Sequence, residues 1–346
     1  MDFSNVLINW YLQNMRNLPW RETTNPYHIW LSEIILQQTR VAQGLPYYYA
    51  FLKKFPDVNA LANADEEDVL KLWQGLGYYS RARNLHFTAK TIVNDMHGEF
   101  PSNYKELLKL KGVGEYTAAA IASFSYNEPV AVLDGNVFRV LSRYFGINLD
   151  ISQSKSKIEF QKLAQSLLPD NNASEFNQAI MEFGALQCVP KNPNCSSCVF
   201  NSSCYALQKN EIDKLPYKSK KIKVTKRFLN YLILEDSNKN IIVEKRVENG
   251  IWKNLFQFPL IEEIEEKNSD ESMMIIKNFN FKDKRPVDIF VYNEDYIRHK
   301  LSHQDLHIRF YKLNYDCELE GAESIEKIKK YPYPIVLHNF IEANFS

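Results

Sequence analysis

The segment LKGVGEYTAAAIASF, residues 110–124, decides the fold of the first half of the chain. Gly112 and Gly114 separate two stretches with helical spacing of apolar residues, and glycine permits the positive φ of a tight turn. The turn leaves backbone N–H groups uncovered beside a helix N-terminus, which favours negative charge. A Gly-x-Gly alone is most often a simple turn, but this helix–turn–helix context predicts that Gly112 and Gly114 bind a phosphate group.

Helical patterns surround this turn from about residue 3 to residue 210, and strand-like patterns follow. The clearest are the helical segments NVLINWYLQNM, IWLSEIILQQ, NVFRVLSRYF and ASEFNQAIMEFGALQ, and the later alternating runs FLNYLILED and HIRFYKLNY. Between them lies the basic stretch KLPYKSKKIKVTKR, whose lysines suit either a solvated linker or phosphate contact. We predict a mainly α-helical domain over residues 1–212, a basic linker over 213–227 and an α+β domain over 228–346.

Composition limits the classes of protein that the chain can belong to. Its 346 residues suit two domains of roughly 100 to 200 residues each. Basic and acidic residues number 42 each, so net charge gives no argument for a polyanionic partner. No apolar run reaches the roughly 20 residues of a membrane helix, and the N-terminus lacks the features of a signal peptide. We therefore expect a cytoplasmic protein that does not associate with membranes.

Four of the five cysteines crowd into CVPKNPNCSSCVFNSSC, residues 188–204. Such crowding in a long chain favours a metal centre over disulfides. Cys188, Cys195, Cys198 and Cys204 could enclose a zinc ion or hold the corners of an iron–sulfur cube. Structural zinc usually uses two short cysteine pairs, and only one short pair is present here.

Two carboxylates stand where chemistry is expected. Glu33 lies in IWLSEIILQQTR with apolar residues on nearly every side, so burial should raise its pKa and make it a proton donor. A capping or salt-bridged acid is the alternative. Asp134 directly precedes an amphipathic helix in EPVAVLDGNVFRVL, where a helix N-cap is the simplest interpretation.

Together these segments resemble the endonuclease III superfamily of DNA glycosylases, and in particular its MutY family of adenine DNA glycosylases. The resemblance rests on LPWR, NPYHIWLSEIILQQTRV, the Gly-x-Gly hairpin, LDGNVFRV and the cysteine spacing. It implies a helical-bundle core with a helix-hairpin-helix, a 4Fe-4S cluster on the four cysteines and a C-terminal Nudix-like domain. The Nudix hydrolase signature itself is missing after Pro259, where the chain runs LIEEIEEKNSDES.

The resemblance also implies roles for particular residues. Glu33 would protonate adenine, which is a poor leaving group until its N7 carries a proton, and Asp134 would stabilise the oxocarbenium ion or attack it transiently. Tyr116 stands where bifunctional relatives carry a lysine, and tyrosine cannot form a Schiff base. Tyr116 and Asn136 would position the sugar and the carboxylates, and the DNA strand would stay intact.

Further residues are expected to contact DNA. Gln38 follows the Glu33 segment, and Tyr78 in QGLGYYSRARNL matches the family's intercalating tyrosine, although tyrosines near glycine turns usually serve packing. In HKLSHQDLHIRF, Ser302 and His303 match the Phe-Ser-His loop that inspects 8-oxoguanine, with Leu301 in place of the aromatic residue. Surface histidines on a strand are the alternative.

The implied function is that of a monofunctional adenine DNA glycosylase in base excision repair. It would excise adenine mispaired with 8-oxoguanine or guanine in double-stranded DNA, as a nucleoid-associated monomer. Two alternatives stay open: a thymine or uracil glycosylase acting on G:T and G:U mismatches, and a DNA-binding module without catalysis.

Overall fold

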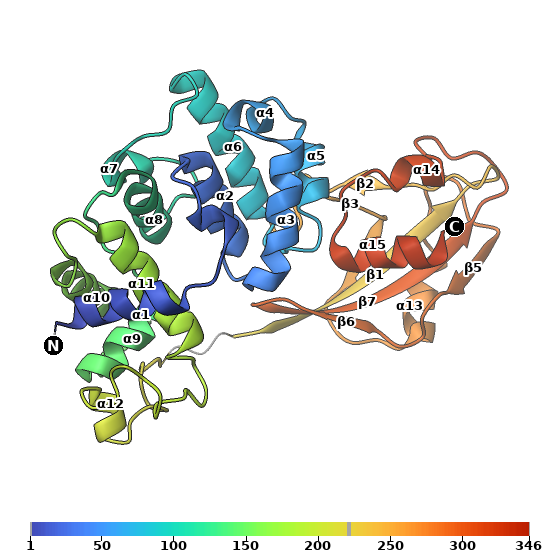
Figure 1. The fold of residues 1–346 in the computed structure, drawn as a ribbon. Helices are drawn as coiled ribbons and strands as arrows, with labels where there is room; N and C mark the ends of the chain where they lie inside the picture. Colours follow the sequence, from blue (N-terminus) through green and yellow to red (C-terminus); the bar gives the residue numbers. More distant parts are fainter. Residues whose placement is uncertain (1, 220–222, 346) are drawn as a thin grey trace. The chain divides into compact units, whose positions relative to one another are not determined.

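A computed structural model describes residues 2–219 and 223–345 of the chain (Figure 1). The chain divides into two compact units, one of Met1–Asn63 with Asn84–Lys220 and one of Ala64–Arg83 with Lys221–Ser346. Each unit is described by itself. Within the described residues, no helix is both long and apolar enough to cross a membrane.

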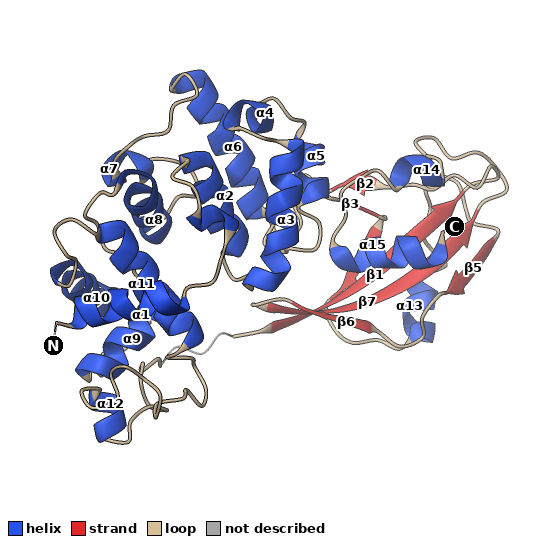
Figure 2. Ribbon diagram, in the orientation of Figure 1, coloured by secondary structure: helices blue, strands red, loops and turns tan. Residues whose placement is uncertain are grey.

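The first unit is built almost entirely from helices (Figure 2). In chain order these are α1 Phe3–Asn14, the 3-10 helix η1 Pro19–Arg21, α2 Pro26–Leu36, α3 Val41–Lys54, α4 Val58–Ala62, the part of α6 Ser80–Asp95 from Asn84 onward, α7 Tyr104–Leu107, α8 Glu115–Tyr126, α9 Gly135–Phe145, α10 Ser154–Ser166, α11 Ala173–Leu186 and α12 Tyr205–Gln208. The prediction of a mainly α-helical first half is confirmed.

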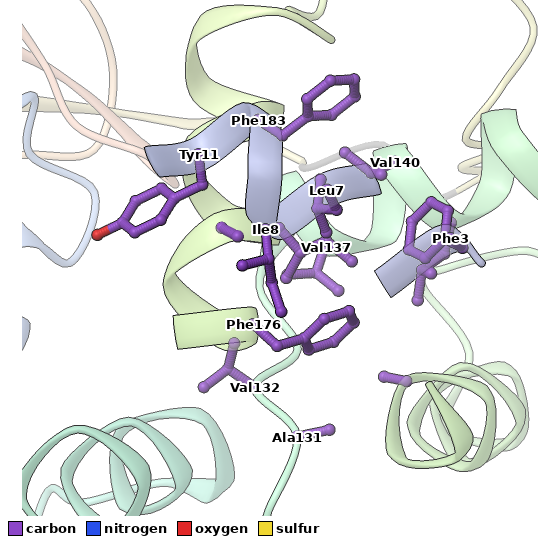
Figure 3. Packing of buried hydrophobic residues seen from close by; sticks show 14 of the residues in the cluster. Phe3, Leu7, Ile8, Tyr11, Ala131, Val132, Val137, Val140, Phe176 and Phe183 are labelled. Carbon is purple, nitrogen blue, oxygen red and sulfur yellow. The ribbon is translucent and has the colours of Figure 1, made fainter. Parts of the chain in front are cut away.

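Helix α11 is central to this unit because it packs against α1, α8 and α9. Figure 3 shows the buried side chains where these helices meet, among them Leu7 of α1, Val137 of α9 and Phe176 of α11. Helix α9 ends at Gly146 in the left-handed region, with φ of 71°. A Cβ at Gly146 would lie 2.5 Å from the ring of Tyr205, directly after the last clustered cysteine, so only glycine fits there.

The second unit contains a mixed sheet with strand order β4-β1-β7-β5, and β6 pairs with β7. The strands are β1 Thr225–Glu235, β4 Leu260–Glu263, β5 Asp288–Val291, β6 Ile297–Lys300 and β7 Gln304–Asn314, and β2 Glu244–Lys245 pairs separately with β3 Phe256–Gln257. The long strands β1 and β7 are parallel, and their alternating side chains pack on both faces of the sheet. On one face Leu232, Leu234 and Leu313 form a core, and on the other Phe310 stacks on Phe340 with ring centroids 3.8 Å apart.

Four helices complete the second unit: α5 Glu66–Leu72, α13 Ser269–Ile276, α14 Ile325–Ile328 and α15 Ile335–Asn344. The α+β prediction for the C-terminal part is confirmed. Residues 64–83, which lie within the helical half of the sequence, also belong to this unit, and no pattern in the sequence indicated this.

The start of the predicted linker is held by two buried side chains of the first unit. The Arg143 guanidinium donates to the carbonyls of Ile212 and Leu215 at 3.1 and 3.0 Å. Asp150 accepts hydrogen bonds from the backbone N–H and the hydroxyl of Ser219. Residues 220–222 of the linker lie outside the described residues, and β1 begins at Thr225. The exact domain boundaries stay a prediction.

Candidate active site

A large cavity opens in the first unit, with a volume of about 1670 Å³. It exceeds the roughly 300 to 1,000 Å³ of ordinary small-molecule sites. Side chains from α2, from the hairpin with α8, from the start of α9, and from α10 and α11 line it. Seven residues singled out from the sequence line this cavity: Glu33, Gln38, Gly112, Gly114, Tyr116, Asp134 and Asn136.

Glu33 is the buried acid of this cavity. It lies in the middle of α2 and is 7% exposed. Burial raises its pKa to about 7, and the negative charge of Asp134 adds to the rise, while a hydrogen bond with Tyr116 opposes it. The predicted proton donor is therefore a group that holds its proton close to neutral pH.

Asp134 serves as the N-cap of α9 and faces the same cavity. One carboxylate oxygen accepts from the backbone N–H of Val137 at 2.8 Å, and the other accepts from the Asn136 amide at 2.7 Å. Burial raises the pKa of Asp134, and these hydrogen bonds oppose that rise because they favour the charged form. The Asp134 side chain thus caps α9 and lines the cavity at the same time.

Asn136 is itself held in place by an arginine. Its amide oxygen accepts from Arg139 Nη2 at 2.8 Å, and the same Nη2 donates to the carbonyl of Gly184 at 2.7 Å. With its oxygen bound to Arg139, the amide of Asn136 can turn only its NH₂ group toward Asp134. The orientation of the carboxylate is therefore fixed by the start of α9 and by α11.

Tyr116 lines the same cavity as the two carboxylates. It lies in the first turn of α8, and its hydroxyl donates to Met181 Sδ at 3.9 Å and also interacts with Glu33. Burial raises the pKa of Tyr116 well above its ordinary value, and the charges of Glu33 and Asp134 add to this. The phenol therefore keeps its proton and can act as a hydrogen-bond donor.

The hairpin before α8 has the geometry that the sequence predicts. Gly112 has φ of 79°, and a Cβ there would lie 2.7 Å from the Asn84 side chain, so the turn requires glycine. Gly114 is the N-cap of α8 and supplies no side-chain cap. The hydroxyl of Thr88 fixes the turn by donating to the carbonyl of Lys111 at 2.7 Å. The N-terminus of α8 therefore lines the cavity.

Sequence analysis missed a second charged cluster on the cavity wall. Glu182 of α11 is 1% exposed and accepts from the guanidinium groups of Arg16 and Arg21 at 2.6 to 2.9 Å. Burial alone would raise the pKa of Glu182, but the hydrogen bonds from the two arginines outweigh it and lower the pKa to about 2. The available signal was an acid within the otherwise apolar helical segment ASEFNQAIMEFGALQ.

The four clustered cysteines line a second, small cavity beside α9 and α11. Arg143 Nη1 lies 3.5 Å from Cys188 Sγ, and the backbone N–H of Phe200 points to Cys198 Sγ at 3.4 Å. Burial raises the pKa of Cys198 to about 11, so a metal would have to displace its proton. Among the described residues, no three Cys, His, Asp or Glu side chains are grouped to hold a single metal ion.

The other predicted DNA contacts lie in the second unit. Tyr78 is exposed, has φ of 45° and contacts the hydroxyl of Ser302 with its own hydroxyl. Ser302 and the exposed His303 form the turn between β6 and β7. Asn254 adopts a left-handed conformation with φ of 64°, which asparagine tolerates better than most residues.

Two arginines near Tyr78 make contacts within the second unit. Arg81 lies over the ring of Trp73, with its guanidinium carbon 5.0 Å from the ring centroid, and donates to the carbonyl of Gly77. Arg83 donates to the carbonyl of Lys253 at 2.8 Å. These contacts hold both guanidinium groups against the second unit.

Comparison with known proteins finds one family match in the helical part of the chain and another in the C-terminal part. Residues 31–166 match the HhH-GPD superfamily of base excision DNA repair proteins, and residues 230–343 match the NUDIX domain. An adenine DNA glycosylase of Buchnera aphidicola subsp. Baizongia pistaciae is 40% identical over 308 residues, which cover 88% of this chain and 84% of the relative. The human adenine DNA glycosylase is 41% identical over 222 residues, which cover 62% of this chain and 41% of the human protein.

Solved structures agree on the helical core. A thermostable thymine-DNA glycosylase aligns with a TM-score of 0.56 and 30% identity, covering 60% of this chain and 95% of that protein. An endonuclease III in a non-covalent DNA complex aligns with a TM-score of 0.53, 21% identity and coverage of 60% and 94%. At that identity the second likeness supports the fold alone.

Proposed function

The chain belongs to the HhH-GPD superfamily of base excision DNA repair proteins and within it to the adenine DNA glycosylases, and from this we propose how its residues remove adenine. It is a DNA N-glycosylase that acts in base excision repair. The observation that supports its mechanism best is the pair of buried carboxylates, Glu33 and Asp134, in one cavity with Tyr116.

We assign Glu33 as the general acid. Its proton passes to N7 of an adenine turned out of the DNA helix, and the bond between C1′ and N9 then breaks with its electron pair going to the base. Asp134, fixed by the Val137 N–H and the Asn136 amide, places negative charge beside the cationic sugar. Water adds at C1′ and gives its proton to Glu33, which restores the acid.

The pKa of Glu33 sets the expected pH dependence. Only the protonated form donates to adenine, and this form is lost as the pH rises through about 7. The single-turnover rate should therefore be flat below this pH and fall about tenfold per pH unit well above it. Rates measured between pH 5.5 and 9 at saturating enzyme test this, and a rate that rises across the whole range would remove Glu33 from the acid role.

Tyr116 predicts that the enzyme leaves the strand unbroken. A labelled duplex containing adenine opposite 8-oxoguanine should yield strand breaks only after alkali treatment, which cleaves at abasic sites. Breaks without alkali would show a lyase and would contradict the argument from Tyr116. If adenine stays in place while thymine opposite guanine is released, the alternative of a mismatch thymine glycosylase holds.

Opposite-base recognition is assigned to the second unit. Tyr78 would enter the stack beside the orphaned base, and Ser302 with His303 would contact 8-oxoguanine. The contact between the Tyr78 and Ser302 hydroxyls supports a joint role. Gly112, Gly114 and Gln38 would bind the strand that carries the adenine. The substrate proposed is double-stranded DNA with A:8-oxoguanine or A:G pairs, bound by a monomer at the nucleoid in the cytoplasm.

We also propose that Cys188, Cys195, Cys198 and Cys204 hold a 4Fe-4S cluster. The four thiols line one cavity, and Arg143 provides positive charge beside Cys188 for an anionic cluster. A bound cluster would tie the end of α11 to the start of α12.

The cluster is tested by metal analysis of the purified protein. Iron and acid-labile sulfide in equal amounts, about four of each per chain, with broad visible absorption, are expected. Replacing Cys198 by Ser should reduce both and the absorption together, whereas Cys317→Ser, outside the cluster, should leave them unchanged. A colourless protein with stoichiometric zinc would rule the cluster out.

A further inference from the structure

Three side chains of the segment 64–83 bind the main chain of residues 329–333. The ammonium group of Lys71 donates to the carbonyls of Lys329 and Tyr331 at 2.8 and 2.9 Å. The Gln74 amide oxygen accepts from the backbone N–H of Tyr333 at 3.1 Å. The Tyr79 hydroxyl donates to the carbonyl of Tyr333 at 3.2 Å. We call these four contacts the clasp.

The segment 329–333, which the clasp holds, is itself fixed by packing. The ring of Tyr331 stacks on Phe256 with centroids 4.0 Å apart and an angle of 5° between the planes. Tyr333 is 1% exposed. Burial lowers the pKa of Lys71, and the carboxylate of Glu342 opposes this. A partly buried ammonium with two carbonyl acceptors is costly to leave unpaired, so the clasp favours one arrangement of the segment.

The same segment carries Tyr78, between Gln74 and the end of the clasp at Tyr79. The loop around Tyr78 is stiffened from within, because Trp73 Nε1 donates to the carbonyl of Gly77 at 3.0 Å and Arg81 donates to the same carbonyl. Tyr78 has φ of 45°, a conformation that its surroundings must maintain. Its hydroxyl then meets that of Ser302.

We propose that Lys71 is a positioning residue for recognition of the opposite base. Through the clasp it holds the Tyr78 loop against the Ser302 turn, so that one rigid body presents both side chains to the DNA. This inference rests on the proposed roles of Tyr78 and Ser302. It predicts that loss of the clasp reduces discrimination between 8-oxoguanine and guanine, while the Glu33 chemistry persists.

The test compares Lys71→Met with Lys330→Met in the full-length protein. Both changes remove one positive charge, but Lys330 is exposed and only its backbone is hydrogen-bonded in the described structure. For Lys71→Met, which removes both charge-assisted hydrogen bonds, we expect the ratio of single-turnover efficiency on A:8-oxoguanine to that on A:G to fall about tenfold or more. Lys330→Met should keep the ratio, and Lys71→Arg, which retains donors, should restore most of it.

Hydrogen exchange gives a readout that does not depend on activity. The amide of Tyr333, bound to Gln74, should exchange faster in Lys71→Met than in Lys330→Met. Faster exchange with an unchanged ratio would overturn the positioning role. Unchanged exchange together with an unchanged ratio would show that the clasp does not hold the segment. If the unsubstituted protein releases no adenine, the proposed function fails first, and the exchange result still reports on the clasp.

Discussion

Replacing Glu33 by Gln should lower the single-turnover rate of adenine release by about a thousandfold or more, within the range expected for loss of a general acid. Glutamine has nearly the same shape and keeps an oxygen for the Tyr116 hydroxyl, but it cannot deliver a proton to N7. Burial holds the Glu33 pKa at about 7, so the wild-type side chain is substantially protonated at neutral pH. Quench experiments on a labelled A:8-oxoguanine duplex measure the rate directly.

Binding and stability separate this result from a folding defect. Glu33→Gln should bind the same duplex as tightly as the wild type, and its melting temperature should not fall, because a buried acid is exchanged for a neutral amide. Glu159→Gln on α10 is a suitable control, since that acid is exposed and pairs with Lys162 at the surface. A Glu33→Gln variant with full activity would support a binding module or a different proton donor.

Replacing Asp134 by Asn is expected to lower the rate of adenine release by about a hundredfold to a thousandfold, as for loss of one electrostatic contact to the transition state. The change removes negative charge beside the sugar without removing the cap, because Asn is as good an N-cap as Asp. Helix α9 should therefore keep its stability, and the melting temperature should change little. The measurement is the single-turnover rate with binding affinity in parallel.

A second capping aspartate supplies the control. Asp57 caps α4 by accepting from the backbone N–H of Ala60 at 2.8 Å, and it does not line the cavity. Asp57→Asn should leave the rate unchanged. If both variants lost activity equally, the effect of Asp134 would come from helix capping and not from its charge.

Local sequence predicted much of this site because its signals are local. The apolar neighbours of Glu33 within one helix predict its burial, and the position of Asp134 before α9 predicts its cap. The Gly-x-Gly motif predicts a tight turn, because the left-handed φ of Gly112 depends on the identity of that one residue.

Other parts could not be predicted because their partners are far apart in the chain. Glu182 forms ion pairs with Arg16 and Arg21, which lie more than 150 residues earlier in the sequence. The periodicity of neither segment indicates such a pair. In the clasp, Lys71 binds main-chain carbonyls near residue 330. Every residue has such a carbonyl, so the sequence does not indicate which ones Lys71 binds. Only the tertiary fold brings these groups together.

The grouping of residues 64–83 with the C-terminal unit affects how shortened forms of this protein should be interpreted. A gene that ends near codon 220 would delete the partner of Lys71, Gln74 and Tyr79 but would still encode those residues. The remaining protein would carry a segment whose polar contacts have been removed, and proteases would cleave this segment more readily. A loss of repair in such a strain would thus have two causes, the missing C-terminal domain and the exposed segment 64–83. A genetic complementation test with the two halves expressed separately would not restore the covalent link between them.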